Sequence, residues 1–338
     1  MSAVQDATTQ TPVVTAVPKK QMSLGPAASL ILVAGLVLAP LFVKNFVIFQ
    51  MTMVLIYALA VLALNILTGA SGQFSLGQSA FYALGAYASA ILIEHGGVNY
   101  AVTLPIAGAI CFVAGFLFGL PALRLSGIYL ALATFSLAAA MPQLLKLGVF
   151  EHWTGGVQGL VVTKPDAPFG LPMSQDMWLY YFTLVVALVI YVLSVNLLKS
   201  RSGRAMMAIR DNEIAASAMG VDISMYKTLA FGVSAGITGV AGALGAIAVQ
   251  FVAPDGYTIQ LAIALFLGMV VGGVGWLPGS LAGAGFIVFV PNIAEHVSKG
   301  LSGAVFGVIL IIIIFVVPHG ARQLAYGAQN MIRKLVHR

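Results

Sequence analysis

The sequence predicts an all-α, polytopic integral membrane protein with about ten transmembrane helices and both termini in the cytoplasm. Three observations support this fold class. First, 60% of the 338 residues are hydrophobic and only 8% are charged. Second, the mean hydropathy is +1.01. Third, apolar runs of about 20 residues, long enough to cross a bilayer as helices, recur along the chain. The centres of these runs lack acidic and basic residues, each of which would cost about 2.5–3.5 kcal/mol there.

Ten apolar runs divide the chain into a leader, one membrane domain at 27–320 and a tail. In chain order the runs are 27–43, 46–68, 74–93, 101–120, 127–145, 177–198, 228–252, 258–275, 279–298 and 301–317. Only Lys44 and Asn45 separate the first two. The leader at 1–26 is rich in Thr, Gln and Pro, and we expect it to be disordered. The tail at 321–338 has apolar residues on one helical face and basic residues elsewhere, which is typical of an interfacial helix.

The positions of the basic residues predict the orientation. With the N-terminus inside, 12 of the 16 Lys and Arg residues lie in cytoplasmic segments, and the four outside are Lys44, Lys146, Lys164 and Lys299. This asymmetry follows the positive-inside rule. The net charge of +6 is therefore explained by topology in a lipid bilayer, and no nucleic-acid partner is expected. The two long connections become an outer loop at 148–176 and a cytoplasmic loop at 199–227.

The segment Gly72–Ala90 is unusually polar for a membrane span. On a continuous helix its polar side chains form a stripe about 100° wide, which contains Ser75, Gln78, Ser79, Tyr82 and Ser89 together with Ala86. A polar stripe facing lipid would be penalised, so the stripe is expected to face either a neighbouring helix or a water-filled path. Gln73 lies off the stripe, near the cytoplasmic end, where water can reach it.

Two further patterns lie in the outer loop and in the seventh run. The outer loop contains Thr154, Gly155, Gly156 and Gln158. These residues either contact an external partner or form an ordered turn. The seventh run has glycines every three or four residues, which is typical of close helix packing; they are Gly232, Gly236, Gly239, Gly242 and Gly245.

The cytoplasmic loop contains the pattern E-x-A-A-x-x-x-G, formed by Glu213, Ala215, Ala216 and Gly220. Small residues on a short helix let another surface approach closely. Glu213 is expected near the helix N-terminus, where negative charge is favoured, and Gly220 can end the helix. From the spacing alone, a solvated loop helix is an equally good interpretation.

Five segments of the chain are specific enough to compare with a known family: GQFSLGQSAFYALGAY, RLSGIYLALATFSLA, TGGVQGL, GRAMMAIRDNEIAASAMGVDISMYKTLAFGVSAGITGVAGALGA and GMVVGGVGWLPGSLAGA. Through these segments, in order, residues 30 to 320 closely resemble the M-type (LivM-like) permease subunits of branched-chain amino acid ABC importers. The resemblance implies a second, similar permease, two cytoplasmic ATPases and an external substrate-binding protein as partners, in a bacterial inner membrane. It also maps Glu213–Gly220 onto the family's coupling segment, which sits in a groove of the ATPase.

The chain departs from the family pattern at two places. Val157 and Gln158 occupy the gap in TGG..GL, where family members often carry an acidic residue, and His319 stands where Arg is common. The first departure leaves the substrate open, because related permeases serve urea, short amides and aromatic acids as well as branched-chain amino acids.

Other function classes have less support in the sequence. The chain contains no G-x-x-x-x-G-K-[ST] phosphate loop, so ATP hydrolysis is expected on a separate chain. No catalytic residue, cofactor or metal site is expected, since no nucleophile constellation or metal-ligand spacing is recognisable. An autonomous secondary carrier or channel remains the alternative, although the spans lack the ionisable groups that ion coupling normally needs.

Overall fold

The computed structural model describes residues 26–125, 127–167 and 173–297, together with 307–308, 311–312 and 321. Most of the predicted leader, of the predicted span at 301–317 and of the predicted tail lies outside these residues. The described elements are α1 (Pro26–Leu38), the 3₁₀-helix η1 (Ala39–Leu41), α2 (Asn45–Leu64), the π-helix η2 (Asn65–Ala70), α3 (Gln78–Glu94), α4 (Tyr100–Ala122), α5 (Ile128–Leu145), α6 (Glu151–Thr154), β1 (Leu160–Val161), α7 (Gln175–Lys199), α8 (Arg201–Asp211), α9 (Glu213–Ala218), α10 (Ile223–Val249), β2 (Phe251–Val252), the 3₁₀-helix η4 (Pro254–Gly256), α11 (Ile259–Gly272) and α12 (Gly279–Val297).

The helices agree with the predicted spans over most of the chain. Each of the nine predicted spans up to residue 298 coincides with a helix, and a short break around Lys44 separates α1 and η1 from α2. Within the described residues, six helical stretches are long and apolar enough to cross a membrane: Asn45–Ala70, Tyr100–Ala122, Ile128–Leu145, Gln175–Lys199, Ile223–Val249 and Pro254–Gly272. The chain is therefore a multi-pass membrane protein.

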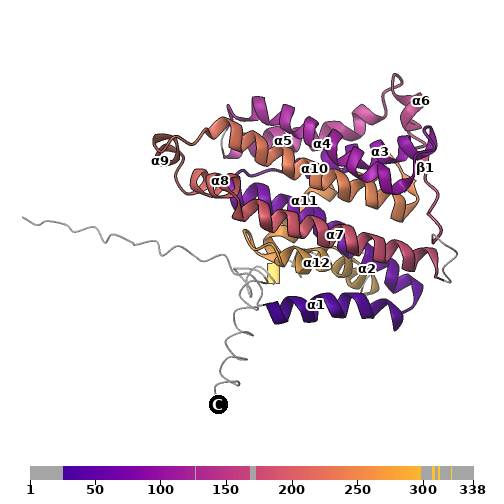
Figure 1. Ribbon diagram of the computed structural model, residues 1–338. Helices are drawn as coiled ribbons and strands as arrows, with labels where there is room; N and C mark the ends of the chain where they lie inside the picture. The colour runs from indigo at the N-terminus through magenta and orange to yellow at the C-terminus, as the bar shows by residue number, and fades with distance from the viewer. Residues whose placement is uncertain are drawn as a thin grey trace, which may run out of the picture.

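The connections between helices gather at two opposite ends of the bundle (Figure 1). One end, which we call the β end, carries α6, β1 and β2; here β1 and β2 pair antiparallel, and Lys146 forms an ion pair with Asp255 at 2.6 Å. The other end, the α9 end, carries α8 and α9, and Arg210 of α8 donates to the Gly69 carbonyl at 2.6 Å. This grouping matches the alternation of loops that the sequence predicts.

The centre of the bundle is α10, which packs against α2, α3 and α4. Small residues make this packing close, as predicted for the glycines of α10. A side chain at Gly242 would meet the Tyr82 carbonyl of α3, and one at Gly239 would meet Cys111 of α4. Gly85 of α3 faces Gly239 in the same way. Close backbone approach of this kind is how helices associate in membranes.

The prediction of a continuous helix from Gly72 was wrong for its first six residues. Residues 72–77 are not helical, and α3 begins only at Gln78. The physical reason is tertiary: the Leu76 N–H donates to Thr134 Oγ1 of α5 at 3.0 Å, and the Gly77 N–H donates to Ser75 Oγ at 3.2 Å. These side chains replace helical partners, as irregular backbone inside a membrane protein requires. Helix α3, with 17 residues, is therefore only about 25 Å long.

Candidate functional site

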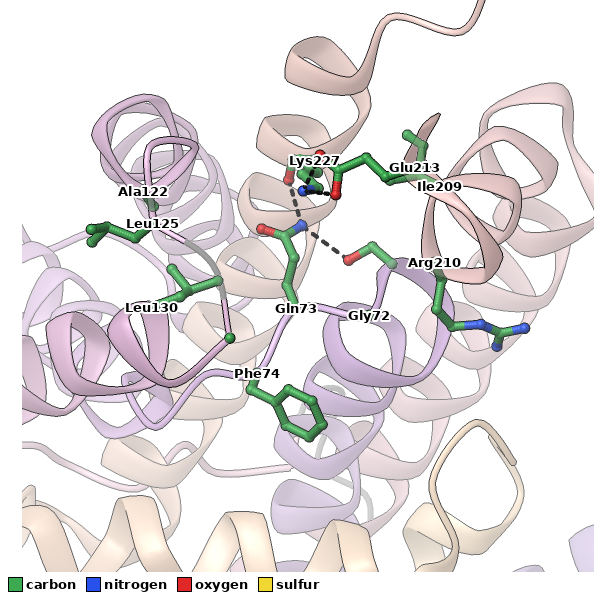
Figure 2. Close-up of a pocket in the computed structure, with 12 residues that line it drawn as sticks. Gly72, Gln73, Phe74, Ala122, Leu125, Leu130, Ile209, Arg210, Glu213 and Lys227 are labelled. Carbon is green, nitrogen blue, oxygen red and sulfur yellow. Dashed lines mark hydrogen bonds and ion pairs between the residues drawn. The ribbon is translucent and has the colours of Figure 1, made fainter. Parts of the chain in front are cut away.

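A polar pocket of about 140 Å³ lies at the α9 end, where five parts of the chain meet. These parts are the connection from α2 to α3, the connection from α4 to α5, α8, α9 and the start of α10. The pocket is drawn in Figure 2 and is lined by Ser71, Gly72, Gln73, Phe74, Ala122, Leu125, Gly127, Leu130, Ile209, Arg210, Glu213 and Lys227.

An ion pair and a glutamine connect three of these parts. Lys227 Nζ lies 2.8 Å from each carboxylate oxygen of Glu213, which joins α9 to α10. The Lys227 carbonyl accepts a hydrogen bond from Gln73 Nε2 at 3.0 Å. The same amide donates to Ser71 Oγ at 3.0 Å. Gln73 is therefore only 7% exposed, and the expectation that it meets water was wrong, because α10 covers it (Figure 2).

Arg210 connects α8 to the end of α2. Its Nη1 donates to the Gly69 carbonyl at 2.6 Å, and its Nη2 lies 2.7 Å from Asp211 Oδ1. Gly69 belongs to the π-helix η2, a conformation that is rare and often found at functional sites. A side chain at Gly72 would meet Arg210 Cγ at 2.9 Å. The guanidinium is thus held against the point where α2 ends.

Helix α9 has the local geometry that the E-x-A-A-x-x-x-G pattern predicts. It begins at Glu213, and the side chain of Asn212 caps it by accepting from the Ala215 N–H at 3.0 Å. Gly220 adopts a φ of +80°. The Val221 N–H then reaches the Ala216 carbonyl at 3.0 Å, and these features together form a Schellman C-cap. Both ends of the short helix are therefore fixed, and α9 protrudes from the end of the bundle (Figure 1).

The outer surface of α9 is apolar. Ile214 is 83% exposed and Met219 is 85% exposed, whereas Ala216 is buried against the rest of the chain. Exposed apolar side chains rimmed by polar residues are typical of protein-interaction surfaces. The E-x-A-A-x-x-x-G pattern identifies Glu213, the two alanines and Gly220 but not Ile214 and Met219. Large apolar residues in a loop predicted to face the cytoplasm are the signal that could have identified these two.

A second polar cluster lies deeper in the bundle, about 10 Å further along α10. Gln78 Nε2 donates to Ser234 Oγ at 2.8 Å, and Thr238 Oγ1 donates to Gln78 Oε1 at 2.7 Å. Ser234 Oγ in turn donates to the Ala63 carbonyl of α2 at 2.8 Å. Gln78 thereby joins α2, α3 and α10. We call the continuous region from Glu213 through residues 72–77 to this cluster the polar seam.

The other members of the predicted polar stripe lie in the same interior region. Ser75, Ser79 and Tyr82 are all buried, and Ser75 precedes α3 rather than lying on it. Among the described residues, Ser79 Oγ has no hydrogen-bond partner. These positions therefore lie inside the bundle and do not face lipid, and Tyr82 also lines an internal cavity.

The predicted residues of the outer loop lie at the β end, far along the bundle from α9. Thr154 Oγ1 donates to the Leu145 carbonyl at 3.0 Å and accepts from the Gly156 N–H at 3.2 Å. Gly155 and Gly156 have φ values of +68° and +57°, and Gln158 is exposed. This part of the loop is an ordered turn. The outer-loop group is thus separate from the other two groups of predicted site residues, which the polar seam connects.

Comparison with known proteins identifies a family that matches most of the chain. Residues 46–314 match the family model described as "Branched-chain amino acid transport system / permease component". The chain is 36% identical to the high-affinity branched-chain amino acid transport system permease protein LivM of Escherichia coli (strain K12), over 73% of this chain and 64% of that protein. It thus spans slightly less than two thirds of the length of this relative. No solved structure matches the chain.

More distant relatives have related but different names. A probable branched-chain amino acid transport permease protein LivH of Methanocaldococcus jannaschii is 25% identical over 72% of this chain and 81% of its own length. The autoinducer 2 import system permease protein LsrC of Salmonella typhimurium is 29% identical over 58% of this chain and 57% of its own length.

Proposed function

The chain belongs to the family of permease components of branched-chain amino acid transport systems, and on that premise we propose that it is the membrane permease subunit of an ATP-driven importer. Its substrates are branched-chain or related small amino acids. It forms the translocation path together with a second, homologous permease, and it carries out no covalent chemistry itself. The membrane is the bacterial inner membrane, with the α9 end and both termini in the cytoplasm.

Three observations support the partners in this proposal. Relatives named LivM and LivH support the pairing of two different permeases. The protruding α9, with Ile214 and Met219 exposed, is the surface for one of two cytoplasmic ATPases. The ordered turn around Thr154, Gly155, Gly156 and Gln158 at the β end is the surface for an external substrate-binding protein.

The polar seam supports this function best, because it gives α9 a direct connection to the interior. Glu213 forms an ion pair with Lys227, and the Lys227 carbonyl accepts a hydrogen bond from Gln73. Arg210 donates to the Gly69 carbonyl in η2, which follows α2. When the ATPases close on ATP, movement of α9 is passed through these contacts to residues 72–77 and α10. Segments of non-helical backbone inside a membrane protein are where transporters commonly change conformation or bind solute.

Reconstitution tests the proposal. Proteoliposomes that contain this chain, its partner permease and the two ATPases, supplied with the binding protein, should accumulate leucine only when ATP is present. Omission of this chain is the matched control. Uptake by this chain alone that follows an ion or solute gradient and ignores ATP would instead identify an autonomous carrier or channel, and would exclude the importer.

The substrate has one specific alternative. Val157 and Gln158 replace the acidic residue often present in the TGG..GL motif, and a relative is named for autoinducer 2 import. A permease for urea, short amides or aromatic acids is therefore a second candidate. Competition against the uptake of labelled leucine separates the two candidates. Strong inhibition by isoleucine and valine, without inhibition by urea, short amides or aromatic acids, favours the branched-chain assignment.

A further inference from the structure

A cavity of about 410 Å³ opens toward the β end between α2, α3, α10 and α11. Its volume lies within the range of about 300–1,000 Å³ that is usual for small-molecule sites. It is separate from the pocket at the α9 end and shares no lining residue with it. The lining residues are Met53, Tyr57, Tyr82, Gly245, Val249, Phe251, Ala253, Asp255, Gly256, Tyr257 and Leu261.

Tyrosine rings form one side of the cavity. The Tyr57 ring stacks on Tyr82 with centroids 6.2 Å apart, and Tyr82 lies 5.9 Å from Tyr257. Behind them, Tyr87 meets Tyr257 edge-on at 6.1 Å. A side chain at Gly245 would collide with the Tyr82 hydroxyl, so this glycine of α10 provides the space in which that hydroxyl lies.

The hydroxyl groups of these tyrosines have no protein partner among the described residues. The Tyr87 hydroxyl is buried and unpaired, and no hydrogen bond to a described residue involves the hydroxyl of Tyr57, Tyr82 or Tyr257. Tyrosines elsewhere differ, because the Tyr180 hydroxyl donates to the Leu36 carbonyl at 2.7 Å. Tyr57, Tyr82 and Tyr257 line the cavity, so a polar molecule inside it can supply the partner that a buried tyrosine hydroxyl normally has.

The remaining wall of the cavity combines one acidic residue, Asp255, with an apolar surface. Asp255, at the rim, is paired with Lys146 at 2.6 Å, and the Asp255 side chain is 70% exposed. Met53, Val249 and Leu261 supply aliphatic contacts. An ion pair, hydroxyl groups, aromatic faces that attract ammonium groups and an aliphatic wall together match one chemical class of solute.

We infer that this cavity is a binding site for a zwitterionic amino acid with an aliphatic side chain. The ammonium group lies near Asp255 and the tyrosine rings, the carboxylate accepts from the tyrosine hydroxyls, and the side chain contacts Met53, Val249 and Leu261. The inference rests on the proposed import function and makes it more specific, because it places a substrate site inside this single chain.

Direct binding tests the inference without transport. The full chain in lipid nanodiscs, titrated with L-leucine, should show saturable binding with a Kd on the order of 1 mM. Leucinamide lacks the carboxylate and isovalerate lacks the ammonium group, and each should bind at least about tenfold more weakly. Equal binding of all three probes, or no binding of leucine, would overturn the inference.

Single hydroxyl deletions locate the site. Tyr57→Phe and Tyr257→Phe should each raise the Kd for leucine about threefold to tenfold, as expected for one lost hydrogen bond. Tyr129→Phe is the matched control, since Tyr129 is an exposed tyrosine on α5 outside the cavity. An unchanged Kd in both cavity variants would contradict the assignment.

Uptake by the assembled importer distinguishes a failure of the cavity inference from a failure of the proposed import function. If the importer is ATP-dependent and the cavity is the site, Tyr57→Phe and Tyr257→Phe raise the KM for leucine severalfold while ATP dependence remains. If ATP-dependent uptake is present but neither KM nor Kd changes, the cavity inference fails and the proposed function stands. If no ATP-dependent uptake occurs, the proposed function fails whatever the nanodisc binding shows.

Discussion

At the scale of single residues, Gln78 shows how far a polar residue in a membrane span can be interpreted from sequence. Its place in a stripe predicts that it does not face lipid, and this is confirmed by its burial. Its hydrogen-bond partners, Ser234 and Thr238, lie about 160 positions away in the chain, on α10. No local pattern identifies them, because the choice between a packing contact and a water-filled path depends on which helix α3 meets.

Replacing Gln78 with Leu should destabilise the chain. Thr238 loses its acceptor and Ser234 loses a donor in a buried place, so we expect a loss of about 1–2 kcal/mol, measured as a lower melting temperature of the purified protein in detergent. Gln143→Leu is the matched control, because Gln143 of α5 is exposed. Equal melting temperatures for the two variants would contradict the packing role.

At the scale of elements, the lengths of the apolar runs predicted the helices. They did not predict the non-helical segment before α3. Residues 72–77 have an amphipathic pattern that suits a helix, yet the structure leaves them non-helical, and the Leu76 N–H donates to Thr134. A side chain on another helix competes successfully for the Leu76 N–H. The closure of α9 by Gly220 was predictable because the capping signal is contained within the loop itself.

Cysteine labelling tests whether this interrupted region moves. With cysteine at Ser75, Ser79 or Tyr82, all of which are buried, reaction with a small aqueous thiol reagent should become faster during turnover if the seam opens. The parent chain, whose only cysteine is the buried Cys111, gives the background rate. Complete protection in every state would favour a packing role over a translocation path.

The contact between α3 and α10 gives a prediction about glycine. Gly242→Ala would place a methyl group against the Tyr82 carbonyl, and we expect overpacking to cost about 1–3 kcal/mol. Gly285→Ala in α12 meets nothing within 4 Å and should be neutral or stabilising by up to about 1 kcal/mol, because alanine is the better helix former. Thermal unfolding of the two variants side by side measures the difference. Similar melting temperatures would contradict the prediction, because they would show that α3 and α10 can move apart at little cost.

At the scale of the whole molecule, the two ends of the bundle have different chemistry. The α9 end presents an apolar protrusion held by ion pairs, and the β end presents an ordered turn and the tyrosine-lined cavity. Hydropathy and basic residues predicted which loops share an end. The cavity was not predictable, because its tyrosines come from α2, α3 and the connection between η4 and α11, and only the folded bundle brings them together.

We propose that α9 moves the interior helices through the ion pair between Glu213 and Lys227. Exchanging the two charges tests it: Glu213→Lys and Lys227→Glu alone should each lower the leucine imported per ATP hydrolysed about tenfold, and the double exchange should restore most of it. The melting temperature of the double exchange should stay close to that of the wild type, because it keeps the ion pair in a place where the Glu213 side chain is 51% exposed.

The decisive measurement is the ratio of leucine uptake to ATP hydrolysis in proteoliposomes containing the wild type, the two single variants and the double exchange. We expect a high ratio for the wild type and the double exchange and a low ratio for the single variants, with ATP hydrolysis itself retained. Single variants that keep the wild-type ratio, or a double exchange no better than either single variant, would contradict it.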